Sequence, residues 1–485
     1  MPAAIAAGIA TSYIESDKGH IAMSSPVAFM TVEEMSAQLA SGRLSSVELV
    51  EHFLKEIDGK DSRLGAFVEV YADEARQAAQ SADLARKAGS AVGPLHGVPI
   101  AIKDLLEMEG RATMGGCEAY RGRRSELTAT LVQRMHAHGM VILGKTHTVE
   151  FATGGWGTNT RLGTPLNPWD LEVPRTPGGS SSGSGVAVAA GLAPWAIGTD
   201  TGGSVRMPAS WCNLTALKVS TGRLSTYGIL PLSPTLDTPG PMTRTVADTR
   251  ILYRALKGPD PYDFRTRLVP PDGPVRTLKD LSGLRLARMP AAERDIVDRE
   301  VLAAYDASLE VLREAGARIV DVTLPYQFGE VAELNALIMN AEGYSFYEQL
   351  LEDTSQPLDE HVRPRLLNGR QVRAADYLRA VRRREAMQAE MAPVFADIDA
   401  LLTPSTATPP VPVREVDQTK GPAHFTRFAN FFNLAALSLP NGATATGLPT
   451  SLQIIGAPYA EEAVLQIGEI YQARTAWHTR TPAGL

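Results

Sequence analysis

Two Gly-Gly-Ser units lie in the middle of the 485-residue chain and place Ser180 and Ser204 24 positions apart. Serine in a glycine-rich loop occurs in phosphate-binding loops and at catalytic nucleophiles. It is more often a turn residue that bonds its own backbone, so one such unit indicates nothing by itself. The chemistry of the pair therefore depends on the residues that accompany it.

Nucleotide binding fits this loop poorly. A P-loop ends in Gly-Lys followed by Ser or Thr, and no such ending follows either Gly-Gly-Ser unit. A dinucleotide fingerprint that began at Gly183 and Gly185 would require a third glycine where Val188 stands. We therefore predict no nucleotide cofactor, and no other cofactor.

A serine nucleophile needs a base, and three known arrangements do not supply one. Residues 179–183 match the nucleophile elbow G-x-S-x-G, but that motif follows a strand, and residues 166–177 contain three prolines. A histidine base would come from His361, His424 or His478, none of which has a convincing loop setting. No lysine has a serine three residues before it, as a Ser-x-x-Lys motif requires. The base must lie elsewhere.

The elements that would position these serines follow an α/β pattern. Residues 97–104 form a short apolar run that ends in two charges, which predicts a buried strand with Lys103 at its end. A helix is predicted over 129–137, and a strand over 140–143. Residues 154–241 are rich in Gly, Ser, Thr and Pro but contain apolar runs, which predicts tight turns inside a core.

The flanking regions are mainly helical. Residues 31–80 have helical periodicity, with a capping box at Thr31 and Glu34 that predicts two helices. Prolines and charges predict a surface connection over 257–274. Farther along, the pattern predicts helices over 295–315 and 331–391, strands over 284–287, 317–322, 400–404 and 450–455, and a closing helix over 461–474.

Composition excludes several classes of partner. The formal net charge is -7 and the one arginine cluster, 382–384, has the periodicity of a solvated helix face, so nucleic acid is not expected as a partner. Two cysteines, Cys117 and Cys212, are too few for a disulfide framework or a structural zinc site and suit a reducing cytoplasm; no metal is predicted. Residues 1–30 are interpreted as an N-terminal extension without the basic start of a signal peptide. No run is long and apolar enough for a membrane span.

The chain resembles the amidase signature family over most of its length. That family has paired Gly-Gly-Ser elements at this spacing and an upstream lysine at a strand end. Seven blocks occur here in the family order: GVPIAIKD (97–104), GKTHTVEFATG (144–154), Asn167-Pro168-Trp169, GTDTGGSVRMPAS (198–210), GPMTRTVAD (240–248), LLTPSTATPP (401–410) and TSLQIIG (450–456).

The resemblance implies a fold and a set of site residues. The fold is an α/β domain over 31–485, with a central mixed sheet covered by helices on both faces, a signature core at about 90–250 and a variable, substrate-shaping region at about 257–400. By the resemblance, Lys103 matches the catalytic lysine, Ser180 the bridging serine in a cis peptide, and Ser204 the acylated nucleophile. Further expected residues are the oxyanion-hole stretch Thr201, Gly202, Gly203 and Ser204, and the supporting residues Ser181, Asp200 and Arg206.

The implied chemistry is physically consistent. A serine hydroxyl is a weak nucleophile until a base accepts its proton. Lysine can be that base only when neutral, and its ordinary pKa is ~10.4. Burial at the end of an apolar strand lowers this pKa, and Ser180, as both donor and acceptor, can relay the proton between Lys103 and Ser204. Lys145 is a second lysine at a strand end and is expected to be structural.

The expected activity is hydrolysis of a linear carboxylic acid amide to a carboxylate and ammonia or an amine. Trp156 and Gly155 follow the Glu-Phe-Ala block, and an inward-facing Trp156 would favour a small aromatic or hydrophobic substrate; a core tryptophan is the alternative. Carbamates, ureas and esters suit the same machinery. Another alternative is the A subunit of the amidotransferase that makes glutaminyl-tRNA, which depends on a partner. A homodimer is compatible with the sequence.

Overall fold

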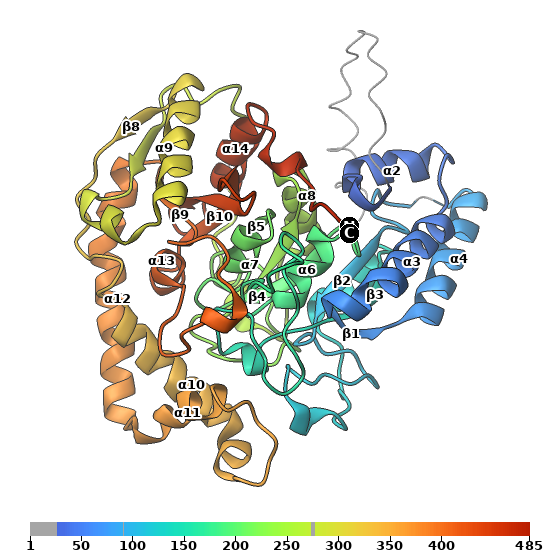
Figure 1. The fold of residues 1–485 in the computed structure, drawn as a ribbon, viewed down its shortest axis with the longest axis horizontal. Coiled ribbons are helices and arrows are strands. Elements are labelled where there is room, and N and C mark those ends of the chain that lie inside the picture. The colour runs from blue at the N-terminus through green and yellow to red at the C-terminus, as the bar shows by residue number, and fades with distance from the viewer. Residues whose placement is uncertain (1–26, 91, 273–276) are drawn as a thin grey trace.

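The computed structural model describes residues 27–90, 92–272 and 277–485. The predicted N-terminal extension therefore lies almost entirely outside the described residues. Within them, eleven strands form one mixed sheet in the order β1-β3-β2-β4-β6-β5-β10-β11-β9-β7-β8 (Figure 1). The strands are β1 (Phe67–Val70), β2 (Pro99–Lys103), β3 (Val141–Thr146), β4 (Ala196–Asp200), β5 (Thr215–Lys218), β6 (Thr238–Thr243), β7 (Arg285–Arg288), β8 (Arg318–Val320), β9 (Ala400–Pro404), β10 (Ala435–Ala443) and β11 (Pro449–Gly456).

Helices pack on both faces of this sheet. On β10, the Ser438 hydroxyl faces the Arg206 carbonyl of α7, while Leu437 and Leu439 face Gly468 of α14; since alternate residues of a strand point to opposite faces, α7 and α14 cover opposite sides. The α-helices are α2 (Val32–Ala40), α3 (Ser46–Leu64), α4 (Ala72–Lys87), α5 (Thr130–Ala137), α6 (Ser182–Ala189), α7 (Arg206–Trp211), α8 (Val246–Leu256), α9 (Arg299–Glu314), α10 (Ala332–Glu352), α11 (Val362–Leu367), α12 (Ala374–Asp397), α13 (His424–Phe431) and α14 (Glu461–Gln472).

The N-terminal helices confirm the capping prediction and correct the number of elements. Thr31 accepts from the backbone of Glu34, and the Glu34 side chain accepts from Thr31, so the predicted capping box begins α2. A second capping box at Ser45 and Glu48 begins α3. Two helices were expected over 31–80, but β1 and α4 follow α3, because the chain turns at Gly65 and pairs antiparallel with β3.

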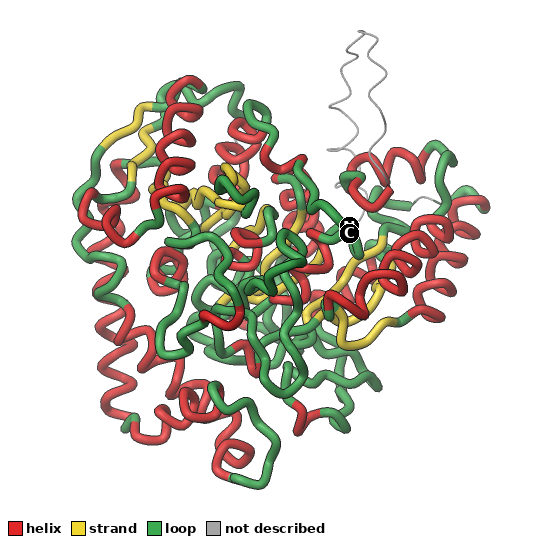
Figure 2. Tube along the Cα trace, viewed as in Figure 1, coloured by secondary structure: helices red, strands yellow, loops and turns green. Residues whose placement is uncertain are grey.

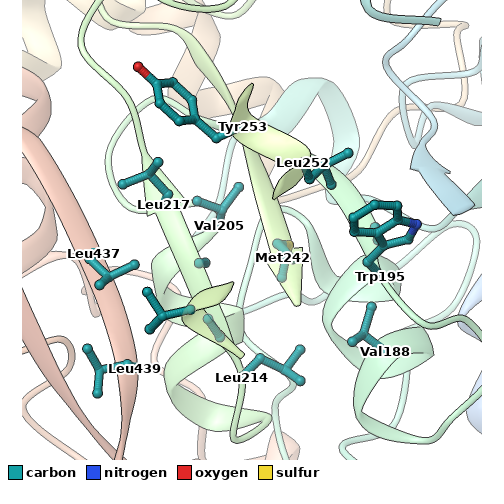
Figure 3. Packing of buried hydrophobic residues seen from close by; sticks show 14 of the residues in the cluster. Val188, Trp195, Val205, Leu214, Leu217, Met242, Leu252, Tyr253, Leu437 and Leu439 are labelled. Carbon is teal, nitrogen blue, oxygen red and sulfur yellow. The ribbon is translucent and has the colours of Figure 1, made fainter. Parts of the chain in front are cut away.

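The core that supports the centre of the sheet is continuous. Figure 3 shows Trp195 and Leu252 at one side of this packing and Leu437 at the other, with Val205 and Leu217 between them. The glycine-rich segment 154–241 contributes α6, β4, α7, β5 and β6 to it, which confirms that this segment belongs to the core. Burial of such apolar side chains stabilises the fold by roughly 25 cal/mol per Å² removed from water.

Long loops nonetheless occupy the middle of the molecule, where Figure 2 shows green tube between the strands and the helices α10 and α11. The strands β2 and β4, which run parallel, end at these loops, and β6, antiparallel to β4, begins there. The predicted connection over 257–274 lies at the surface where it is described, with Tyr262, Phe264 and Leu268 exposed. Among the described residues, no helix combines the length and apolar character that crossing a membrane requires.

Candidate active site

Ser180 lies in a tight turn that only glycine can precede. The Gly179–Ser180 peptide bond is cis, as the family resemblance implies. A Cβ added to Gly179 would lie 2.6 Å from the backbone nitrogen of Gly157, so no larger residue fits there. The Ser180 carbonyl accepts from the Val149 N–H at 3.1 Å and from the Thr148 hydroxyl at 3.0 Å. These contacts fix the backbone that carries the Ser180 hydroxyl.

Lys103 ends β2, as predicted, and its side chain is fully buried. Its Nζ donates to Ser180 Oγ at 2.8 Å and to Thr199 Oγ1 at 2.8 Å. Thr199 belongs to β4, which pairs in parallel with β2. The fold therefore brings Lys103 and Ser180 together and adds Thr199, which the sequence motifs did not single out.

Burial lowers the pKa of Lys103 to about 7, while the negative charges of Asp200 and Asp237 act in the opposite direction. Removal from water penalises the charged ammonium form, which explains the direction of the larger effect. A substantial fraction of Lys103 is therefore neutral near neutral pH and able to accept a proton.

Ser204 lies just after β4, in the loop that leads into α7, and is buried. The Ser181 N–H donates to the Ser204 carbonyl at 3.2 Å, so the loop of Ser204 lies directly against the residue that follows Ser180. The Ser181 hydroxyl instead bonds the backbone carbonyl of Thr199 at 3.2 Å and accepts from its N–H at 3.3 Å. Ser181 thus fastens the serine loop to β4 and does not bond the Ser180 hydroxyl.

Asp200 and Arg206 form the predicted ion pair around Ser204. Both side chains are fully buried, and Arg206 Nη2 lies 2.8 Å from Asp200 Oδ1. Arg206 also donates to the Thr426 carbonyl and to Gln453 Oε1, and Asn430 Nδ2 donates to Asp200 Oδ1 at 2.8 Å. Asn430 and Gln453 come from the C-terminal third of the chain and were not among the predicted site residues, although Gln453 lies in the TSLQIIG block; only folding brings them to this pair.

The predicted oxyanion-hole stretch requires one correction. The Gly203 N–H donates to Asp200 Oδ1 at 2.8 Å, so that amide is already occupied. The N–H groups of Thr201, Gly202 and Ser204 donate to no acceptor among the described residues. A Cβ added to Gly202 would meet no atom within 4 Å, so this part of the loop borders open space. Three of the four predicted donors are therefore available beside an opening.

Lys145 has the structural role that was expected. In the β2–β3 register it lies opposite Ile102, the neighbour of Lys103, so its side chain points to the other face of the sheet. There its Nζ donates to the Ala112 carbonyl at 2.6 Å and lies 3.3 Å from Asp104 Oδ1. Lys145 therefore does not compete with Lys103 as the base.

The histidines considered as alternative bases lie elsewhere. The His424 ring bonds Glu293 at 2.7 Å, and His361 is near Glu360. Within the residues the structure describes, neither these two nor His478 hydrogen-bonds either serine.

Gly155 lies beside the cis peptide, where its carbonyl accepts from the Gly179 N–H at 2.8 Å. The next residue, Trp156, is half-buried and stacks on Trp211 with ring centroids 5.6 Å apart. Its indole N–H donates to the Lys420 carbonyl at 2.8 Å. The indole thus packs against neighbouring protein groups, and a contact with substrate stays a prediction.

Known proteins resemble this chain over nearly its whole length. The family model described as Amidase matches residues 48–465. The A subunit of glutamyl-tRNA(Gln) amidotransferase from Chloroflexus aggregans is 35% identical over 481 residues, which cover 94% of this chain and 98% of that protein. The solved peptide amidase from Stenotrophomonas maltophilia is 30% identical with a TM-score of 0.84, covering 95% of this chain and 99% of its own.

The solved A subunit of glutamyl-tRNA(Gln) amidotransferase from Thermotoga maritima is likewise 30% identical, with a TM-score of 0.77 and coverage of 93% of this chain and 95% of that one. Both the family match and these relatives span nearly the whole described fold. The chain therefore belongs to the amidase family.

Proposed function

We propose that this protein cleaves the C–N bond of a carboxylic acid amide through an acyl-enzyme on Ser204, with Ser180 and Lys103 as the proton-transfer chain. The observation that carries the proposal is the 2.8 Å hydrogen bond between Lys103 Nζ and Ser180 Oγ in a buried site. Burial favours a neutral lysine, which is the form that can accept a proton.

The reaction proceeds in two halves. Ser204 Oγ attacks the amide carbonyl carbon while its proton passes to Ser180, whose own proton passes to Lys103. The free N–H groups of Thr201, Gly202 and Ser204 stabilise the resulting oxyanion, each contributing about 3 kcal/mol in the transition state. The C–N bond then breaks as the leaving nitrogen receives the proton, and water or another nucleophile releases the acyl group from Ser204.

One version of this function is that of an amidotransferase A subunit, which releases ammonia from an amide donor in a complex. The relatives at 35% identity over 93–94% of this chain carry that name, and they favour this version over a free hydrolase. An inward-facing Trp156 in the pocket wall would disfavour a small polar substrate. Its stacking on Trp211 supports a packing role instead and removes that argument.

The other version is a hydrolase that acts alone. The specific observation in its favour is the closer structural match to the peptide amidase, with a TM-score of 0.84 against 0.77 for the amidotransferase protein. A carbamate, urea or ester substrate remains part of this version, because the acyl-enzyme step places no demand on what adjoins the carbonyl.

The first experiment traps the nucleophile. The purified protein is treated with a serine-reactive sulfonyl fluoride and the adduct is mapped by peptide mass spectrometry, with Ser204→Ala as the control. We expect the adduct on Ser204; an adduct on another serine, with Ser204 unmodified, contradicts the mechanism.

The second experiment separates the two versions. Ammonia release from glutamine, a primary aryl amide and a peptide amide is measured for the protein alone and after co-expression with the other amidotransferase components of its own organism. Glutamine hydrolysis that appears only in the complex supports the amidotransferase version. Turnover of the aryl or peptide amide by the isolated protein supports the free hydrolase.

A further inference from the structure

Asp237 lies just before β6 and joins two loops beside the nucleophile. Its Oδ2 accepts from the N–H groups of Leu232 and Ser233, each at 2.9 Å, and so closes its own turn. Its Oδ1 accepts from the Thr201 hydroxyl at 2.5 Å. Thr201 is the first residue after β4 and one of the three residues whose N–H remains available to an oxyanion.

The turn that carries Asp237 is itself held by the helical region. Glu342 of α10 accepts from the Thr235 N–H at 3.1 Å and also from the hydroxyls of Ser233 and Thr235. The Tyr377 hydroxyl of α12 donates to the same carboxylate at 2.5 Å. The turn that carries Asp237 is thus held by α10 and α12 as well as by its contact with Thr201.

Asp237 differs from Asp200 in how its charge is balanced. Asp200 is paired with Arg206, whereas Asp237 forms no ion pair within the described part of the chain and is bonded by neutral donors only. The carboxylates that act on the Lys103 ammonium are these two, and Glu342 is the charged group that acts on Asp237. Asp237 is therefore a carboxylate beside the loop of Ser204 whose charge no cation balances within the described residues.

We infer that Asp237 is a positioning residue, which fixes the start of the nucleophile loop by holding the Thr201 hydroxyl. It also stabilises the protonated form of Lys103 through its charge. This inference rests on the proposed function of Ser204 and Lys103. By this inference, the Asp237 side chain both places the Thr201 N–H as an oxyanion donor and influences the pH range in which Lys103 is neutral.

Two substitutions separate these effects. Thr201→Val removes the hydroxyl and leaves the carboxylate, so it tests placement; Thr201→Ser restores the hydroxyl. Asp237→Asn keeps an oxygen for Leu232 and Ser233 and removes the charge, so it tests the action on Lys103. Thr130 and Asp260 form a matched control, because the Thr130 hydroxyl donates to buried Asp260 at 2.6 Å without touching the serine site.

The measurement is the rate at which Ser204 reacts with a fluorophosphonate, followed by peptide mapping from about pH 5 to about pH 9. We expect Thr201→Val to lower the plateau rate about tenfold because it misplaces an oxyanion donor, and Thr201→Ser to restore it. Asp237→Asn moves the acid limb to lower pH by about one unit, because loss of a nearby negative charge favours neutral lysine. Thr130→Val and Asp260→Asn keep the wild-type rate and acid limb.

The outcomes are distinguishable. If wild-type Ser204 is not labelled, the proposed function fails before the inference is tested. If wild-type Ser204 is labelled and the Thr201 and Asp237 variants match it in plateau rate and acid limb, the inference is overturned. A loss of thermal stability in all four Thr→Val and Asp→Asn variants, without any change in labelling, would mean that Asp237 only stabilises the fold. That result also overturns the inference.

Discussion

Lys103 Nζ and Ser180 Oγ lie 2.8 Å apart although 77 positions separate the two residues in the chain. The lysine comes from the end of a strand and the serine from a turn ahead of α6, so their contact depends on the pairing of β2 with β4. A hydrogen bond between a buried amine and a hydroxyl has the geometry that general-base catalysis requires.

Lys103→Met is expected to lower amide hydrolysis and Ser204 labelling by at least about a thousandfold, because among the described residues no other basic side chain hydrogen-bonds Ser180. Lys145→Met is the matched control, since both lysines are buried at strand ends. It leaves Asp104 buried without its cation, so urea denaturation should show a loss of ~3–5 kcal/mol. The folded fraction of Lys145→Met should still label at the wild-type rate; equal loss of labelling in the two variants would contradict the assignment.

Activity should rise with pH through about pH 7, because the pKa of Lys103 lies at about 7 and the neutral form is the base. Protonation below that pH removes the base, so kcat/KM falls on the acid side. Burial also lowers the pKa of Lys218 to about 7, yet Lys218 donates only to the carbonyls of Val219 and Leu434. The acid limb should therefore persist in Lys218→Met. Its disappearance in that variant would show that Lys218, and not Lys103, produces the limb.

Alanine substitutions at Gly202 and Gly203 should have different effects, one on substrate binding and the other on stability. A Cβ at Gly203 would lie 2.1 Å from Thr426 Oγ1, and its φ of +127° is unfavourable for alanine, so Gly203→Ala should lower stability by about 1–3 kcal/mol. Gly202→Ala has free space and should fold normally but raise KM, because the added methyl group projects into the opening. Thermal denaturation and steady-state kinetics measure the two effects, and unchanged KM in folded Gly202→Ala would exclude a substrate path at that residue.

Arg206→Met should destabilise the protein by ~3–5 kcal/mol, because it leaves the Asp200 carboxylate buried without its cation. Arg288→Met is the comparison, since Arg288 and Asp321 form a similar pair at 2.6 Å that is exposed. No measurable change is expected there, because water screens a surface pair. Similar urea midpoints for the two variants would show that burial does not determine the strength of the Asp200–Arg206 pair.

Much of the fold followed from local pattern. The strand that ends at Lys103 is apolar up to its final charge, and Thr31 with Glu34 marks a helix start, so β2 and the start of α2 were predicted close to where the structure has them. Strand β10 was not predicted: it includes Pro440 and two glycine or asparagine positions, which local rules read as a turn. Its pairing with β5 and β11 supplies the stabilisation that its own sequence lacks.

The sequence by itself determined which residues were candidates for chemistry, since the two Gly-Gly-Ser units and the strand-end lysine match blocks of the amidase signature family in order. Only the tertiary structure decided what each of them touches. It assigned Thr199 to Lys103, Asn430 to Asp200 and Thr201 to Asp237, because these contacts join elements that are distant along the chain. Hydrogen-bond partners depend on distances of a few tenths of an ångström, and such distances arise from packing rather than from spacing in the sequence.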